Sequence, residues 1–156
     1  MYTRILLAVD GSSPSDAALR EALALARGTQ ARLRVVHVID SPYDYPDVMF
    51  GHVAGDLEDL QQAWQKVGRE VLDRALSVAR TVPLEPEVSL IETAGRRLSE
   101  AIVDEARSWS ADLIVLGTHG RRGLHRLLLG SVAEGVARTS PVSVLLVREP
   151  GSGSER

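Results

Sequence analysis

The sequence predicts an α/β fold: an open, doubly wound sheet of five parallel strands with helices on both faces. Three observations support this prediction. Short apolar runs alternate with segments of helical periodicity along almost the whole chain, beginning and ending with a strand. Most of the strands are continuously apolar, which is typical of strands buried on both faces. Each strand is separated from the next by a helix, and right-handed crossovers of this kind join parallel strands.

The first three elements lie in the first quarter of the chain. Residues 5–9 form a short apolar strand. A helix follows, with Ser13 predicted as its N-cap and Pro14 in its first turn, where proline is favoured. Gly28 is predicted to end this helix, because glycine readily adopts the left-handed conformation found after helix C-termini. Residues 31–39 are the second strand.

The remaining elements continue the alternation. In order, they are a long helix over 57–79, a strand over 87–92, a helix over 96–109, a strand over 113–117, a helix over 132–139 and a strand over 142–147. An irregular acidic segment over residues 40–59 leads into the long helix, and its role stays open. We expect a single domain over residues 1–148, followed by a disordered tail rich in Gly and Ser over 149–156.

Composition excludes several classes of function. The 156 residues contain no cysteine, which excludes a disulfide framework, a thiolate nucleophile and a cysteine zinc site. The net charge of −3 and the 4% share of aromatic residues give no basis for a nucleic-acid partner. The N-terminus leads into the first strand without a signal peptide, and no apolar run reaches the roughly 20 residues needed to span a bilayer. We therefore expect a cytoplasmic protein with no membrane partner.

The most informative motif follows the fourth strand. Gly117 and Gly120 are followed by a nine-residue spacer and by Gly130-Ser131 at the start of a helix. Glycines let the backbone approach a ligand closely, and a helix N-terminus presents free N–H groups at the positive end of its dipole. The spacer also carries three arginines, Arg121, Arg122 and Arg126. The segment is either a phosphate cradle or a structural turn, and Ser131 is an N-cap, a phosphate contact or both.

Other polar residues fall on the same edge of the predicted sheet. Ligands of doubly wound sheets bind beyond the carboxyl ends of the strands, where Asp10 ends the first strand and His119 follows the fourth. Asp10 either stabilises a turn or accepts a hydrogen bond from a ribose or base, and His119 is a candidate for contacting a phosphate or stacking on a ligand. His37 is predicted to be a core or sheet-face residue. The four histidines show no metal-ligand spacing, so no metal site is predicted.

Competing nucleotide motifs are absent from the sequence. The chain lacks the phosphate-binding loop that ends in Gly-Lys-Ser/Thr, the Gly-x-Gly-x-x-Gly dinucleotide fingerprint and the Gly-x-Ser-x-Gly nucleophile turn of α/β-hydrolases. Gly117-x-x-Gly120, nine residues and Gly130-Ser131 instead resemble the ATP-binding signature of the universal stress protein family. The resemblance also covers residues 5–12, 36–38, 112–120 and 141–147, and thus extends over nearly the whole chain.

The resemblance implies a Rossmann-like domain that binds ATP. It further implies Mg²⁺ held by the phosphates and a homodimer paired through the last strand, residues 142–147. Carried onto this sequence, Ala8, Val9 and Asp10 would hold the adenosine end and Val38 would pack on the adenine. The ribose and phosphates would be surrounded by Gly117, His119, Gly120, Arg121, Gly130, Ser131 and Val132.

Two classes of function fit such a site. The first is a nucleotide-dependent regulatory module of the stress response. The alternative is a slow ATPase or an autophosphorylating enzyme, with transfer to Ser131 or Thr118. The sequence places no general base beside a hydroxyl or a water, so binding is favoured over catalysis and no catalytic residue is predicted. A structural interaction protein with an empty cleft is a third and weaker interpretation.

Overall fold

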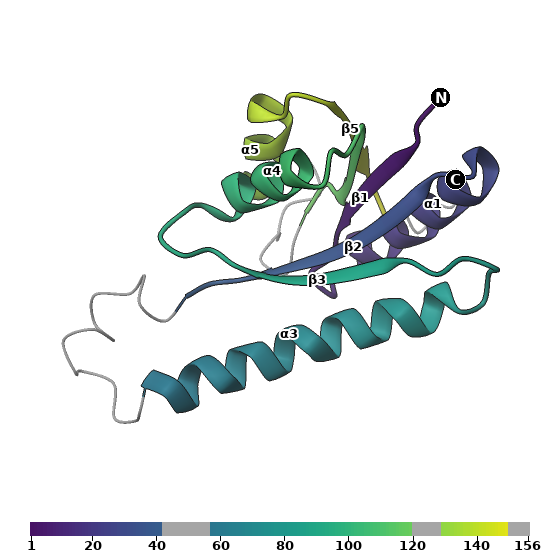
Figure 1. Ribbon diagram of the computed structural model, residues 1–156. Helices are drawn as coiled ribbons and strands as arrows, with labels where there is room; N and C mark the ends of the chain where they lie inside the picture. Colours follow the sequence, from purple (N-terminus) through teal and green to yellow (C-terminus); the bar gives the residue numbers. More distant parts are fainter. Residues whose placement is uncertain (42–56, 120–128, 150–156) are drawn as a thin grey trace, which may run out of the picture.

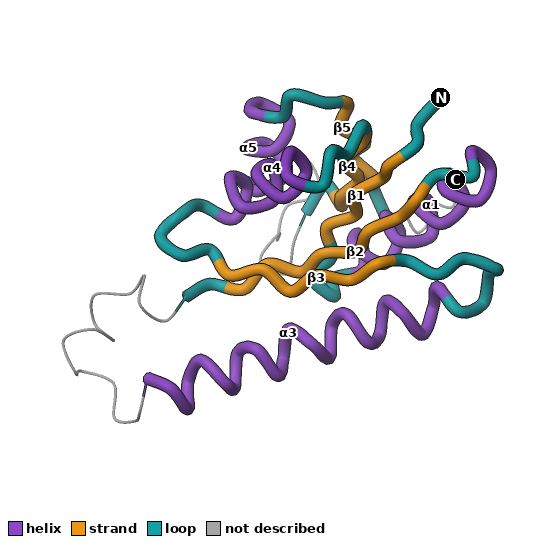
Figure 2. The backbone as a smooth tube through the Cα atoms, in the orientation of Figure 1, coloured by secondary structure: helices purple, strands orange, loops and turns teal. Residues whose placement is uncertain are grey.

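The computed structural model describes residues 1–41, 57–119 and 129–149 (Figure 1). Its elements, in chain order, are β1 (Arg4–Ala8), α1 (Ser13–Thr29), β2 (Arg32–Ile39), α3 (Leu57–Ala79), β3 (Glu87–Glu92), α4 (Leu98–Ser108), β4 (Leu113–Gly117), α5 (Ser131–Thr139) and β5 (Ser143–Val147). Strands and helices alternate as predicted, and Figure 2 shows this alternation along the backbone. The predicted tail lies outside the described residues from position 150 onward.

The five strands form one sheet in the order β3-β2-β1-β4-β5, and every neighbouring pair is parallel. The predicted fold class is confirmed. The chain moves from β1 outward to β3 on one side and then from β4 to β5 on the other. The switch point therefore lies between β1 and β4, which is where ligands bind in sheets of this kind.

Two hydrophobic cores cover the two faces of the sheet. Ile5, Leu7 and Val35 pack against α1 and α3 on one face. Leu6 and Val36 pack against α4 and α5 on the other. Figure 1 shows this layering, with α3 running along β3 and β2 on the side opposite α4. Because side chains alternate along a strand, consecutive residues of β1 and β2 enter opposite cores.

The two ends of α1 differ from the prediction by one or two residues. Ser12, with an extended backbone, is the N-cap, and its hydroxyl accepts a hydrogen bond from the Ser15 amide at 3.3 Å. The prediction of Ser13 as the cap is therefore wrong. Gly28 is helical, and the left-handed residue is Gln30, with φ of 58°. The helix continues past Gly28 and ends at Thr29. The amides of Gln30 and Ala31 both donate to Ala26 O, the second at 3.0 Å, and these bonds close the last turn.

A cluster of charged residues holds together the amino-terminal edge of the sheet. Arg34 donates to Glu87 at 2.5 Å and to Glu105 at 2.7 Å, and its guanidinium lies 4.8 Å from the centre of the Trp109 ring. The hydrogen bond from Arg34 lowers the pKa of the Glu87 carboxyl, outweighing the opposing effect of burial. These contacts lie at the edge opposite the carboxyl ends of the strands, so they stabilise the fold away from the predicted site.

No helix in the described ranges combines the length and apolar character needed to cross a bilayer.

Candidate functional site

A cleft of about 680 Å³ lies at the carboxyl edge of the sheet. Its walls come from the exits of β1, β2 and β4, from the amino-terminal half of α3, from the first two turns of α4 and from the first turn of α5. Residues from both faces of the sheet contribute, because the cleft straddles the strand ends at the switch point. This is the position that the topology predicts for a ligand.

Nine of the eleven predicted site residues line this cleft. They are Ala8, Val9, Asp10, Val38, Gly117, His119, Gly130, Ser131 and Val132. The other two, Gly120 and Arg121, lie outside the described residues, as do Arg122 and Arg126. The structure thus brings together segments from the first, second and fourth strand–helix units.

The turn after β1 is built around Asp10. Its Oδ1 accepts hydrogen bonds from the Ser12 amide at 2.9 Å and the Ser12 hydroxyl at 2.6 Å. The Asp10 amide donates to the Ser15 hydroxyl at 3.1 Å, and Gly11 has φ of 77°. Asp10 therefore stabilises the turn and also lines the cleft, so both of its predicted roles are compatible with the structure.

Gly117 allows the start of α1 to approach β4. A Cβ atom at this position would lie 2.8 Å from the backbone carbon of Pro14, 2.9 Å from its Cβ and 3.0 Å from its carbonyl oxygen. Such distances are shorter than real Cβ contacts, so any side chain here would push Pro14 away. The absence of a side chain at Gly117 is therefore required by packing, in addition to the close ligand approach that the sequence suggested.

Backbone hydrogen bonds fix both ends of the glycine segment. Thr118 N–H donates to Val147 O at 2.9 Å, and Gly130 N–H donates to Thr118 O at 2.8 Å. Gly130 is the extended N-cap of α5, so the alternative in which Ser131 is the N-cap is wrong; Ser131 is the first helical residue. The intrahelical bonds begin with Glu134 N–H on Gly130 O at 2.9 Å.

The first turn of α5 has amide donors without an intrahelical acceptor, and its residues line the cleft. The amide groups of the first residues of an α-helix have no intrahelical acceptor, and here they belong to Ser131, Val132 and Ala133. All three residues line the cleft. Together with the positive end of the helix dipole, these amides make a site for an anion.

His119 lines the same cleft as these residues. Its Nδ1 lies 3.0 Å from the Thr118 hydroxyl oxygen. Its Nε2 is buried and has no hydrogen-bond partner among the described residues. A buried polar nitrogen without a partner among the described residues points to an acceptor or donor supplied by a ligand or by water. The arrangement therefore fits a polar ligand, such as a phosphate or ribose.

Several residues that line the cleft were not predicted from the sequence. His37 was assigned to the core or a sheet face; it lies on the face covered by α3, but it also borders the cleft. Trp64 and Val67 enter from α3, and Leu98 and Ile102 from α4. Their spacing of three or four residues marks a helix face in the sequence. Which part of that face reaches the cleft depends on how the helices cross the sheet, which periodicity does not specify.

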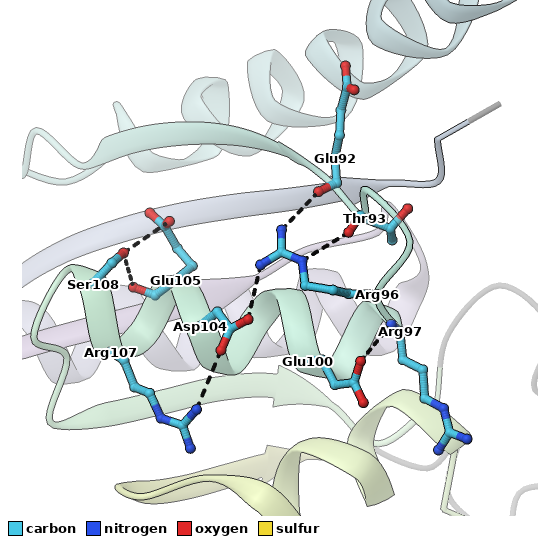
Figure 3. A network of polar contacts seen from close by, with 9 residues as sticks. All are labelled: Glu92, Thr93, Arg96, Arg97, Glu100, Asp104, Glu105, Arg107 and Ser108. Atoms are coloured by element: carbon cyan, nitrogen blue, oxygen red, sulfur yellow. Dashed lines mark hydrogen bonds and ion pairs between the residues drawn. The ribbon is translucent and has the colours of Figure 1, made fainter. Parts of the chain in front are cut away.

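Polar contacts hold α4 in the position that brings Leu98 and Ile102 to the cleft (Figure 3). Arg96 donates through Nε to Thr93 O at 3.0 Å and through a terminal nitrogen to Asp104 at 3.0 Å. The Arg97 amide donates to the Glu100 carboxylate at 3.0 Å. These bonds tie the end of β3 to the first two turns of α4, and the apolar wall of the cleft is thereby attached to the sheet.

The described residues contain no group of three or more His, Asp or Glu side chains arranged to hold a metal ion.

The fold and the cleft define a doubly wound α/β protein with a helix N-terminus in the cleft at its switch point. The sequence profile of the universal stress protein family matches residues 1–148. The chain belongs to the universal stress protein family.

Individual relatives agree with this assignment. Universal stress protein MJ0531 of Methanocaldococcus jannaschii is 32% identical over 152 residues, covering 96% of this chain and 84% of the relative. Among solved structures, that of hypothetical protein MJ0577 superimposes with a TM-score of 0.80 at 25% identity, covering 97% of this chain and 99% of the other.

Two solved relatives contain adenine nucleotides. The universal stress protein of Archaeoglobus fulgidus in complex with dAMP is 27% identical and has a TM-score of 0.65, with 94% of this chain and 98% of that chain covered. A universal stress protein in complex with cAMP is 25% identical and has a TM-score of 0.69, with 96% and 99% covered.

Proposed function

We propose that the protein binds ATP in the cleft at the carboxyl edge of its sheet and acts as a nucleotide-dependent regulatory module of the stress response. The observation that carries the proposal is the first turn of α5. The first three residues of this helix, whose amides have no intrahelical acceptor, line a cleft of about 680 Å³ together with His119. The relatives that contain dAMP and cAMP support an adenine nucleotide as the ligand.

The residues of the cleft divide into a phosphate end and an adenosine end. At the phosphate end, we assign Gly117, His119, Gly130, Ser131 and Val132 to the phosphates and ribose, with Gly120 and Arg121 added from the part of the chain outside the described residues. At the adenosine end, we assign Ala8, Val9, Asp10 and Val38. Mg²⁺, where present, would be held by the phosphates.

The backbone of Val38 suits adenine in particular. Val9 N–H donates to Val36 O at 2.9 Å, so the peptide groups of Val36 face β1. Groups two residues apart on a strand face the same side, so those of Val38 also point that way, beyond the last residue of β1. An open N–H and C=O of one residue match the N1 acceptor and the N6 donor of adenine, whereas guanine presents the opposite pattern at the corresponding atoms.

A pair of variants at Ser131 tests the role of the α5 N-terminus. Ser131→Pro removes the hydroxyl and the amide hydrogen, and proline is tolerated here because position 131 is the first helical residue and Gly130 before it is extended. Ser131→Ala removes the hydroxyl alone and is the matched control. We expect Ser131→Pro to weaken ATP binding by about tenfold in calorimetry, while Ser131→Ala stays within about threefold of the wild type.

The wild-type protein provides the decisive measurement. Nucleotide extracted from the protein as purified is identified by chromatography, and ATP, GTP and cAMP are then titrated into nucleotide-free protein. Binding of ATP that competes with cAMP supports the proposal. If no adenine nucleotide co-purifies and none produces heat or a shift in Tm, the proposal is wrong.

A second candidate function rests on one contact. The Thr118 hydroxyl lies 3.0 Å from His119 Nδ1, and a hydroxyl beside an imidazole is the pair that activates a nucleophile. This pair favours slow phosphoryl transfer to Thr118 over transfer to Ser131. Incubation with γ-labelled ATP should then label the wild type and not Thr118→Val. Release of phosphate without labelling would indicate an ATPase. The absence of both signals would indicate that the protein binds ATP without catalysing a reaction.

We also propose that the protein forms a homodimer through β5. We further propose that residues 1–148 make up a single domain and that the protein is cytoplasmic. β5 is an edge strand, and four of its five residues are half-buried. Such an edge is suited to pairing with a second copy across a two-fold axis. Analytical ultracentrifugation with and without ATP measures the oligomeric state, and a monomer under both conditions would contradict the dimer.

A further inference from the structure

The last hydrogen bond between β1 and β2 is replaced by a side chain. In a regular parallel pair, a residue that donates to one residue of its neighbour accepts from the residue two positions further along. Val9 N–H donates to Val36 O at 2.9 Å, so Val9 O would be expected to accept from Val38 N–H. The hydrogen bonds of this described region do not include that contact. Instead, His37 Nδ1 lies 2.6 Å from Val9 O.

This contact determines where one proton of His37 resides. A carbonyl oxygen only accepts, so Nδ1 is the donor and carries a hydrogen. The imidazole ring is also packed closely against α3. A Cβ atom at Gly68 of α3 would lie 3.2 Å from His37 Cδ2 and 3.0 Å from Ile39 Cγ2. Because α3 approaches the sheet so closely, the imidazole has little freedom to turn away from Val9.

The consequence falls on Val38. Val9 O accepts from the imidazole, and the described hydrogen bonds include none from the Val38 amide to this oxygen, so that amide is available to another acceptor. Val38 lines the cleft, and its peptide groups face the side where β1 has ended. The same hydrogen bond fixes the carbonyl that immediately precedes Asp10, and so it also holds the turn at the adenosine end of the cleft.

We propose that His37 is a positioning residue for adenine recognition: its Nδ1–H holds the Val9 carbonyl, so that the Val38 amide remains open to N1 of the base. This inference rests on the proposed function, because it assigns the means by which the adenosine end of that site selects its base. Without the imidazole donor, Val38 N–H is free to bond to Val9 O, and the strand pair closes over the position that the base would occupy.

Two pairs of variants separate this role from a structural one. His37→Asn places an amide nitrogen near the position of Nδ1, whereas His37→Leu has similar volume and no donor. If His37→Leu fails to fold, His37→Gln replaces it. The longer glutamine side chain places its amide nitrogen near the position of Nε2, so this variant also has no donor at the position of Nδ1. We expect the donor-lacking or misplaced variant to lose about tenfold in ATP affinity and most of its preference for ATP over GTP. His37→Asn should stay within about threefold of the wild type.

Amide hydrogen exchange at Val38 provides a readout that does not depend on affinity. In the nucleotide-free wild type and in His37→Asn, the Val38 amide should exchange rapidly and become protected when ATP is added. In His37→Leu or His37→Gln, it should already be protected without ATP. A protected Val38 amide in the nucleotide-free wild type would overturn the inference.

The outcomes distinguish this inference from the proposed function. If the wild type does not bind ATP, the proposed function fails and the role of His37 in adenine recognition fails with it. If the wild type binds ATP and all His37 variants keep its affinity and its ATP-to-GTP ratio, only the inference about His37 fails. Equal losses in His37→Asn and His37→Leu would likewise overturn it, because the preserved donor would then have no effect.

Discussion

Gly117→Ala tests the close contact between β4 and the start of α1. The added methyl group would meet the backbone carbon of Pro14 at 2.8 Å and its carbonyl oxygen at 3.0 Å. These are backbone atoms, which cannot rotate away as a side-chain end does. Overpacking costs about 1–3 kcal/mol, and the lower entropy of an unfolded alanine chain returns about 0.4–1 kcal/mol. We therefore expect the free energy of unfolding to fall by about 1 kcal/mol, or Tm by about 2–4 °C.

A second glycine provides a matched control. Gly28 lies in α1, and a Cβ atom there would meet nothing within 4 Å. Gly28→Ala should therefore stabilise the protein by about 0.5–1 kcal/mol through helix propensity alone. Urea and thermal unfolding of both variants give the two free energies, and ATP titration shows whether displacement of Pro14 disturbs the neighbouring Asp10 turn. If Gly117→Ala is as stable as the wild type, the packing argument for Gly117 is refuted.

Two further predictions concern stability away from the cleft. Asp112 is partly buried, and burial alone would raise the pKa of its carboxyl. The carboxylate accepts hydrogen bonds from the Thr3 hydroxyl and from the amides of Thr3 and Arg4. These bonds outweigh burial and lower the pKa below its ordinary value of 3.8. The stabilisation is therefore complete above that ordinary value and is lost as the pH falls through the lower pKa of the folded state. Asp112→Asn should lower the free energy of unfolding by about 1–2 kcal/mol at pH 7 and by progressively less as the pH falls below the ordinary value of 3.8, as measured in urea. A constant difference across this range would contradict the assignment. Ser12→Ala should cost about 1 kcal/mol, because it removes the cap of α1, whereas Ser13→Ala should be nearly neutral; the reverse order in thermal unfolding would restore Ser13 as the cap.

The sequence predicts most of the fold because its strands are short apolar runs between clear helices. The long helix over Leu57–Ala79 and the strands over Glu87–Glu92 and Leu113–Gly117 have the predicted bounds. The ends of α1 are less predictable, since adjacent serines compete for one cap and a glycine is tolerated within the last turn. At such positions, a shift of one residue changes the local free energy by little, and tertiary contacts decide.

The site is predicted in part for a similar reason. Residues next to a strand end, such as Asp10 and His119, are placed by topology alone, because parallel strands bring their carboxyl ends to one edge. His37 and Trp64 depend instead on register and on the crossing of α3 over β2. His37 and Val38 are neighbours in sequence but face opposite sides of the sheet, and only the end of β1 makes both of them part of the cleft.

The hydrogen bond from Gly130 N–H to Thr118 O has a consequence for how this protein tolerates changes in chain length. It joins the residue that follows β4 to the N-cap of α5, so the two elements are tied directly to each other. The entropy of closing a chain segment grows slowly with its length, by about 0.6 kcal/mol for each doubling. We therefore expect the stability of the sheet to depend more on this one hydrogen bond than on the number of residues between Thr118 and Gly130.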